Sequence, residues 1–138
     1  MDPLHQAPLY AQWRLPLLRS VLERGGVVAC PAEGVWGLSC DPYSEAAVAD
    51  LLTLKLRSVQ KGLIVVAANA AMFDEVLSYL SPDERHRSRA SWPGPNTWLV
   101  PNHGVFPDWI TGESRDVAIR VTSALPLRRL SESFGGPL

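Results

Sequence analysis

Three cationic side chains, Lys55, Arg57 and Lys61, fall within seven positions in the stretch KLRSVQK. Lys55 and Lys61 are the only lysines of the chain, which otherwise takes its positive charge from arginine. A lysine ammonium is a compact charge on a flexible stem, whereas an arginine guanidinium is a planar fork that pairs with two oxygens of a phosphate or carboxylate. The cluster therefore predicts a site for a phosphate-rich ligand, with a solvated basic turn at a helix end as the alternative.

A helix is expected to carry the first of these cations. Ser44 can cap its first turn. Apolar side chains then recur at three- or four-residue steps, at Val48, Leu51 and Leu52. Lys55 continues this stripe, so we expect it beside the core, where it extends its ammonium to solvent, neutralises the helix C-terminus or leans over a cleft.

The remaining pattern predicts an α/β domain with a mixed sheet. Short apolar runs predict strands at 27–30, 62–68, 97–101 and 117–121. Amphipathic runs predict helices at 9–24, from Ser44 onward, and at 70–79, 82–90 and 125–134. The basic cluster precedes a strand, whereas ligands of simple doubly wound sheets gather at the carboxyl ends of strands.

Length and composition fit one domain, 1–138, of 15.1 kDa with an ordinary globular balance of 46% hydrophobic and 20% charged residues. The formal net charge of -1 means that any site for a polyanion must be a local patch. Cys30 and Cys40 have no metal-binding spacing, and we expect reduced thiols, as in the cytoplasm. Charged residues interrupt the N-terminal region, which predicts neither a signal peptide nor a membrane span.

Four stretches, in order, closely resemble the YrdC/TsaC family of threonylcarbamoyl-AMP synthases. They are GGVVACPAEGVWGLSCDP (25–42), LKLRSVQKGLIVVAAN (54–69), SWPGPNTWLVP (91–101) and VAIRVT (117–122). The resemblance extends from about residue 20 to the last residue. It implies a YrdC-like α/β fold, in which flanking helices cover a twisted mixed parallel/antiparallel sheet with a concave basic surface.

The resemblance also implies a nucleotidyltransferase. Its reaction converts L-threonine, bicarbonate and ATP into threonylcarbamoyl-adenylate and pyrophosphate. The product then goes to a partner complex that transfers the threonylcarbamoyl group to tRNA in the cytoplasm. Mg²⁺ is expected to accompany ATP through phosphates and water, so no dedicated metal site is expected in the protein.

Matching positions receive roles from this resemblance. Lys55 and Arg57 match the family's Lys-x-Arg pair, which implies catalysis and ATP binding, and Lys61 falls at a nearby ATP-binding position. Arg120 matches an arginine that holds the threonine carboxylate. Glu33 is also assigned to threonine binding, with organisation of its own loop as the alternative. Negative charge collects on the carbamate, the triphosphate and the leaving pyrophosphate, so the reaction needs fixed positive donors more than a nucleophile.

The sequence departs from the family in two places. Ala32 stands where the family usually has threonine, and Gly34 where many members have threonine or alanine. Family members also continue into a strand and a Ser-x-Asn signature that complete the nucleotide site, whereas this sequence stops at Leu138. We therefore expect either a shortened chain or a divergent member lacking half of its pocket, with impaired turnover and an uncovered sheet edge.

Two other functions remain as alternatives. The first is a non-catalytic RNA-binding module, which the missing signature favours and the near-neutral charge disfavours. RHRSR (85–89) would then contact tRNA or another RNA instead of forming a solvated helix face. The second is the carbamoyl-adenylate-forming unit of hydrogenase-maturation proteins, whose zinc-finger cysteines are missing from this sequence.

Overall fold

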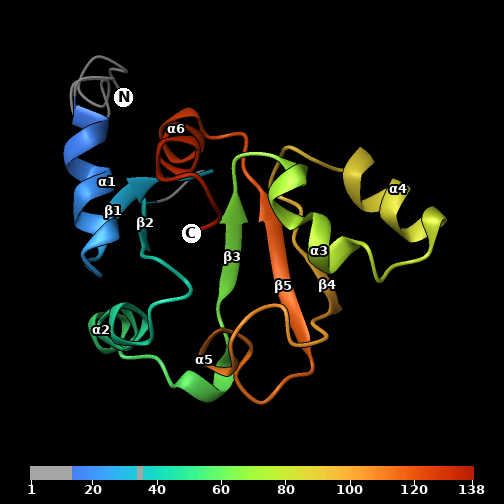
Figure 1. Cartoon of the computed structure of the whole chain (residues 1–138), viewed down its shortest axis with the longest axis horizontal. Coiled ribbons are helices and arrows are strands. Elements are labelled where there is room, and N and C mark those ends of the chain that lie inside the picture. The colour runs from blue at the N-terminus through green and yellow to red at the C-terminus, as the bar shows by residue number, and fades with distance from the viewer. Residues whose placement is uncertain (1–13, 34–35) are drawn as a thin grey trace.

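A mixed sheet and a separate hairpin carry the strands of this chain (Figure 1). The computed structural model describes residues 14–33 and 36–138. The strands are β1 (Val28–Pro31), β2 (Trp36–Ser39), β3 (Ile64–Ala67), β4 (Trp98–Pro101) and β5 (Asp116–Val121). The helices are α1 (Leu15–Glu23), α2 (Glu45–Lys55), α3 (Asp74–Leu77), α4 (Pro82–Ala90), α5 (Asp108–Thr111) and α6 (Leu125–Phe134). The 3₁₀ turns are η3 (Val59–Lys61) and η4 (Ala70–Phe73).

β5 is the central strand of the larger sheet, whose order is β3-β5-β4. It runs parallel to β3, with Val66 opposite Arg120, and antiparallel to β4, with Trp98 opposite Ile119. Alternate residues of β5 are fully buried, as expected for a strand with one face on the core. The predicted α/β class with a mixed sheet is therefore confirmed.

β1 and β2 form an antiparallel hairpin with Cys30 opposite Gly37. The sequence analysis did not predict β2. Its four residues, WGLS, are exposed or half-buried and lack both an apolar run and clear alternation. Pairing with β1 therefore defines this strand, rather than the propensity of its own residues.

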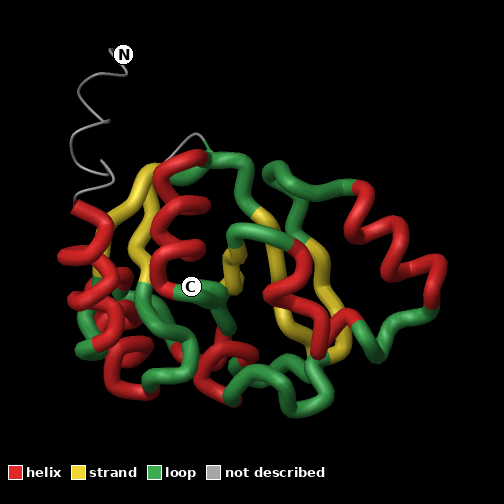
Figure 2. Tube along the Cα trace, turned by 45° about the horizontal axis from the view of Figure 1, so that its top comes forward, coloured by secondary structure: helices red, strands yellow, loops and turns green. Residues whose placement is uncertain are grey.

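Two apolar clusters hold these layers together. α1 packs against α6 beside the hairpin, as the tube in Figure 2 shows, and buries Leu22 and Leu130 completely. The larger cluster joins α2 and α3 to the three-stranded sheet around Phe73, Val65 and Ile119. In the part of the chain that the structure describes, no helix has the length and apolar character needed to span a membrane.

The outer edge of β3 is paired through the main chain of Leu138. Val66 N–H donates to the Leu138 carbonyl at 2.9 Å, and Leu138 N–H donates to the Val66 carbonyl at 2.8 Å. This reciprocal exchange is the hydrogen-bonded pair of an antiparallel ladder. Beyond it, the Ile64 side chain is 49% exposed. Because this pair is antiparallel, the main chain at Leu138 runs along β3 toward residue 62.

The helices predicted from Ser44 onward, at 82–90 and at 125–134 are confirmed as α2, α4 and α6. Ser44 caps α2 by accepting the Ala47 N–H at 3.2 Å, as predicted. α4 begins with a reciprocal capping box between Ser81 and Glu84. The predicted helix at 70–79 is instead η4 followed by the short α3, and α5 was not predicted. The described part of the 9–24 prediction is α1; residues 9–13 lie outside the described ranges.

Gly112 is predicted to be irreplaceable in the contact between α5 and η3. Its φ is +66°, and a Cβ there would meet the Gln60 carbonyl oxygen and lie 2.8 Å from Gly62 N. We expect Gly112→Ala to lower the free energy of unfolding by about 2 kcal/mol or more, because strain and a clash with backbone combine. Chemical denaturation measures this loss.

Gly104→Ala is the matched control. Gly104 has φ +76°, but a Cβ there meets nothing within 4 Å. Only the left-handed strain remains, so a loss of about 1 kcal/mol is expected. Equal losses in the two variants would contradict the role of the Gly112 contact.

Candidate functional site

A cavity of about 240 Å³ lies between the β1–β2 hairpin and β3. Its walls are mostly apolar, and Leu127 of α6 and the last residue, Leu138, contribute to it. Three of the predicted cations line this one cavity: Lys55, Arg57 and Arg120. The structure thus brings these three cationic side chains to one cavity.

The end of α2 explains how Lys55 and Arg57 reach the same cavity. Lys55 is the last helical residue, one turn after Leu51, which also lines the cavity. Leu56 then adopts a left-handed conformation, with φ 52° and ψ 42°. Arg57 N–H donates back to the Leu52 carbonyl at 3.0 Å, which turns the chain across the helix end. Lys55 is exposed and lines the cavity, and it also lies in the last turn of α2, at the helix C-terminus.

Arg57 is anchored at one point. Its Nε–H donates to the Gly62 carbonyl at 3.1 Å. The same side chain lines a second cavity of about 140 Å³, together with Lys61, Ser114 and Asp116. Arg57 therefore lines both cavities. Lys61 lines only the second of them, whereas Lys55 and Arg120 line the first.

Glu33 lies close to Arg120, in the segment between β1 and β2. Its Oε2 is 3.9 Å from Arg120 Nη1, and both side chains are largely buried. Its Oε1 accepts hydrogen bonds from the Thr122 hydroxyl, from Ser123 N–H at 2.7 Å and from Ala124 N–H at 3.2 Å. Burial raises the pKa of Glu33, but these hydrogen bonds together lower it by more than burial raises it. The net pKa of Glu33 therefore lies below the ordinary value. The carboxylate is therefore ionised at neutral pH.

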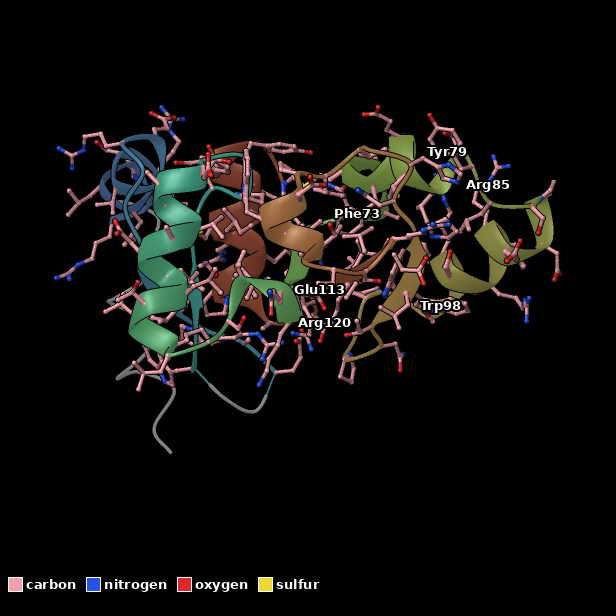
Figure 3. The ribbon with its side chains drawn as sticks, turned by 90° about the horizontal axis from the view of Figure 1, so that it is seen from below. Phe73, Tyr79, Arg85, Trp98, Glu113 and Arg120 are labelled. Atoms are coloured by element: carbon pink, nitrogen blue, oxygen red, sulfur yellow. The ribbon has the colours of Figure 1, made fainter. Side chains whose placement is uncertain are left out.

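Arg120 and the basic helix α4 are well separated. In Figure 3, Arg120 lies near the middle of the molecule, whereas Arg85 lies toward the side that carries α4. On α4, Arg87 pairs with Asp83 at 3.2 Å and Arg89 pairs with Asp74 at 2.7 Å, all with exposed side chains. This helix face is therefore solvated, and its charge is partly neutralised.

Cys30 and Cys40 also line the cavity, and neither forms a disulfide bond. Burial, with a smaller contribution from Asp41, raises the pKa of the Cys40 thiol to about 11. A thiol with that pKa is protonated at neutral pH and is a poor nucleophile. Among residues 14–33 and 36–138, no group of three histidine, cysteine or acidic side chains is placed to hold a metal ion.

Ala32, at the position where the resemblance leads us to expect threonine, lines the cavity with a methyl group. Gly34, the other departure, lies outside the described residues. Sequence reasoning missed Thr122 and Ser123, which bind Glu33 across 89 and 90 positions of sequence. Thr122 ends the VAIRVT stretch, and this was the one available signal.

Comparisons with known proteins agree with this geometry. The Sua5/YciO/YrdC family, described as "Telomere recombination", matches residues 20–138. A threonylcarbamoyl-AMP synthase of Cellvibrio japonicus is 47% identical over 125 residues, which cover 91% of this chain and 66% of the relative. A threonylcarbamoyl-AMP synthase of Pseudomonas aeruginosa is 49% identical over 130 residues, which cover 94% of this chain and 70% of the relative.

Solved structures give the same result. One is P. abyssi Sua5 complexed with L-threonine, which has a TM-score of 0.82 at 31% identity, and the match covers 91% of this chain and 37% of that one. E. coli YciO, at a TM-score of 0.77 and 17% identity over 89% of this chain and 61% of that one, shares the fold. The chain spans about two thirds of the length of the curated relatives, and over that span it belongs to the Sua5/YciO/YrdC family.

Proposed function

We propose that this chain carries the threonylcarbamoyl-AMP synthase activity for which its relatives are named. The observation that carries the proposal is the single cavity lined by Lys55, Arg57 and Arg120. Two polyanionic or carboxylate-bearing substrates must meet in such a site, and three converging cations suit that task. The complex of P. abyssi Sua5 with L-threonine further supports catalysis over RNA binding.

The proposed reaction has two steps. The threonine nitrogen attacks carbon dioxide derived from bicarbonate, which forms the N–C bond of a carbamate and releases the amine proton. A carbamate oxygen then attacks the α-phosphorus of ATP, and the bond from that phosphorus to the bridging oxygen breaks, so that pyrophosphate leaves. No covalent enzyme intermediate is needed, which agrees with the protonated state of Cys40.

Each cation has a proposed role in these steps. Lys55 and Arg57 bind the triphosphate and stabilise the charge that develops as pyrophosphate leaves. Arg120 binds the threonine carboxylate, and Glu33 belongs to the same end of the site. Mg²⁺ enters with ATP as part of the substrate, held by phosphate oxygens and water.

Lys61 is proposed to contact the distal phosphates from the second cavity, with Arg57 lining both cavities. Lys61→Ala should weaken ATP binding about fivefold, as expected for an exposed charge, and should leave threonine binding unchanged. Calorimetric titration of each ligand measures this. An ATP affinity equal to that of the parent chain would remove Lys61 from the site.

The product is proposed to pass to the tRNA threonylcarbamoyl-transfer complex in the cytoplasm. Paired arginines on α4 give the RNA-binding alternative no support, because Arg87 and Arg89 each contact a carboxylate.

The deciding experiment incubates purified protein with ATP, L-threonine and bicarbonate and detects threonylcarbamoyl-adenylate by mass spectrometry. Arg120→Gln should raise the KM for threonine ten- to a hundredfold, because a charge-assisted contact to the carboxylate is lost. Arg128→Ala, which removes an exposed i,i+4 pair with Glu132, is the control. Absence of the adenylate with the parent protein, or an unchanged KM for Arg120→Gln, would contradict the proposal.

A further inference from the structure

The carboxylate of Glu33 closes the junction between β5 and α6. Ala124 is the N-cap residue of α6, and its methyl side chain offers no acceptor to the helix start. Glu33 Oε1 instead accepts the N–H groups of Ser123 and Ala124, which immediately precede the helical residues. The fully buried Thr122 donates its hydroxyl to the same oxygen and accepts Ala124 N–H at 3.0 Å. One oxygen of Glu33 is therefore fully engaged by the protein.

The other oxygen faces Arg120. Glu33 Oε2 is buried and accepts no hydrogen bond from the described residues, and Arg120 Nε is likewise buried without a hydrogen-bond acceptor. The two groups are joined only by the 3.9 Å approach of Oε2 to Nη1. Among the residues that the structure describes, Arg120 is thus held by charge and packing rather than by a directed hydrogen bond. A neighbouring negative charge stabilises a guanidinium in such a half-buried position, since an unpaired buried charge is costly.

We propose that Glu33 is a positioning residue, whose fixed negative charge sets the orientation of the Arg120 guanidinium at the cavity. A direct contact between Glu33 and substrate is disfavoured because Oε1 is saturated and Oε2 is shielded from solvent. That the oriented Arg120 then receives the carboxylate of an α-amino acid rests on the proposed function. The orientation of Arg120 by Glu33 is a property of the unliganded protein and can be tested without substrate.

The first test follows the Nε–H signal of Arg120 by ¹⁵N NMR of the unliganded protein. Its loss in Arg120→Lys assigns the signal. Glu33→Gln keeps the side chain's volume and its Oε1 acceptor but removes the charge, so exchange of this proton with solvent should accelerate about tenfold.

Thr122→Val is the matched control, because it removes one donor to Glu33 and leaves the charge in place. It should change the exchange of the Arg120 proton much less than Glu33→Gln does. If Glu33→Gln does not fold, Glu33→Asp takes its place, because the shorter side chain moves the carboxylate away from Arg120 by one methylene. Unchanged exchange in the folded charge-altering variant, or equal acceleration in Thr122→Val, would overturn the inference.

The second test is a double-mutant cycle on L-threonine affinity. Glu33→Gln should weaken threonine binding about tenfold and leave ATP binding unchanged, and it should have no further effect once Arg120→Gln is present. A second, additive loss would mean that Glu33 contacts the ligand itself, which overturns the inference. If the parent protein binds no threonine, the proposed function fails, and the exchange measurement still decides whether Glu33 positions Arg120.

Discussion

Arg57→Ala is expected to lower the rate of adenylate formation about 100-fold, the effect of removing one preorganised donor from a developing charge. Arg57 lines both cavities, and the hydrogen bond from its Nε–H to the Gly62 carbonyl fixes the position of Nε. The terminal nitrogens then need little reorganisation to meet phosphate oxygens. Pyrophosphate release under saturating ATP and threonine measures the rate, so that a loss in kcat is separated from a loss in KM.

Two variants bracket this result. Arg57→Lys keeps the charge but loses the fork and the Nε donor, so its rate should fall between those of the parent and the alanine variant. Arg87→Ala removes an exposed arginine that pairs with Asp83 on α4 and should leave the rate unchanged. If Arg57→Ala lowers ATP affinity and leaves kcat intact, Arg57 acts in binding alone and its catalytic assignment is wrong.

The second large effect is expected from extending the chain. A segment appended after Leu138 would continue antiparallel to β3 and cover the edge near Ile64, and both residues line the cavity. Appending a strand and the Ser-x-Asn signature that the family resemblance implies should raise turnover about 100-fold, because an additional wall would position the carbamate against the α-phosphate. ATP affinity should change much less, since the phosphate-binding cations are already present.

A control extension separates the strand from its signature. The same segment with alanine in place of the signature serine and asparagine should pair with β3 and restore little turnover. Pyrophosphate release compares the three proteins. If the 138-residue chain turns over as fast as the extended one, catalysis needs only the residues present here.

The elements that the sequence predicted are those whose signals are local. The apolar run at 62–68 contains β3, the run at 117–121 covers all of β5 except Asp116, and Ser44 marks the start of α2 through its own hydroxyl. β2 and α5 were missed because each forms through its partners. β2 pairs with β1, and the Ile110 carbonyl of α5 accepts the Leu63 N–H.

The site was predictable in part for the same reason. Lys55 and Arg57 share a cavity because helix periodicity and a left-handed turn act within a few residues. Lys61 lines a different cavity, because η3 turns the chain away before β3 begins. The contacts of Glu33 with Thr122 and Ser123 join segments about 90 positions apart, and no spacing rule within one segment can reveal them.

The packing of α1 against α6 has a consequence for synthesis on the ribosome. α1 emerges early, yet Leu22 is buried against a cluster that includes Leu127, Leu130 and Leu138. The residues through α6 and Leu138 must therefore leave the exit tunnel before this layer can form, and the high sequence separation of its contacts makes closure slow. Until then the apolar face of the nascent α1 stays open to chaperones.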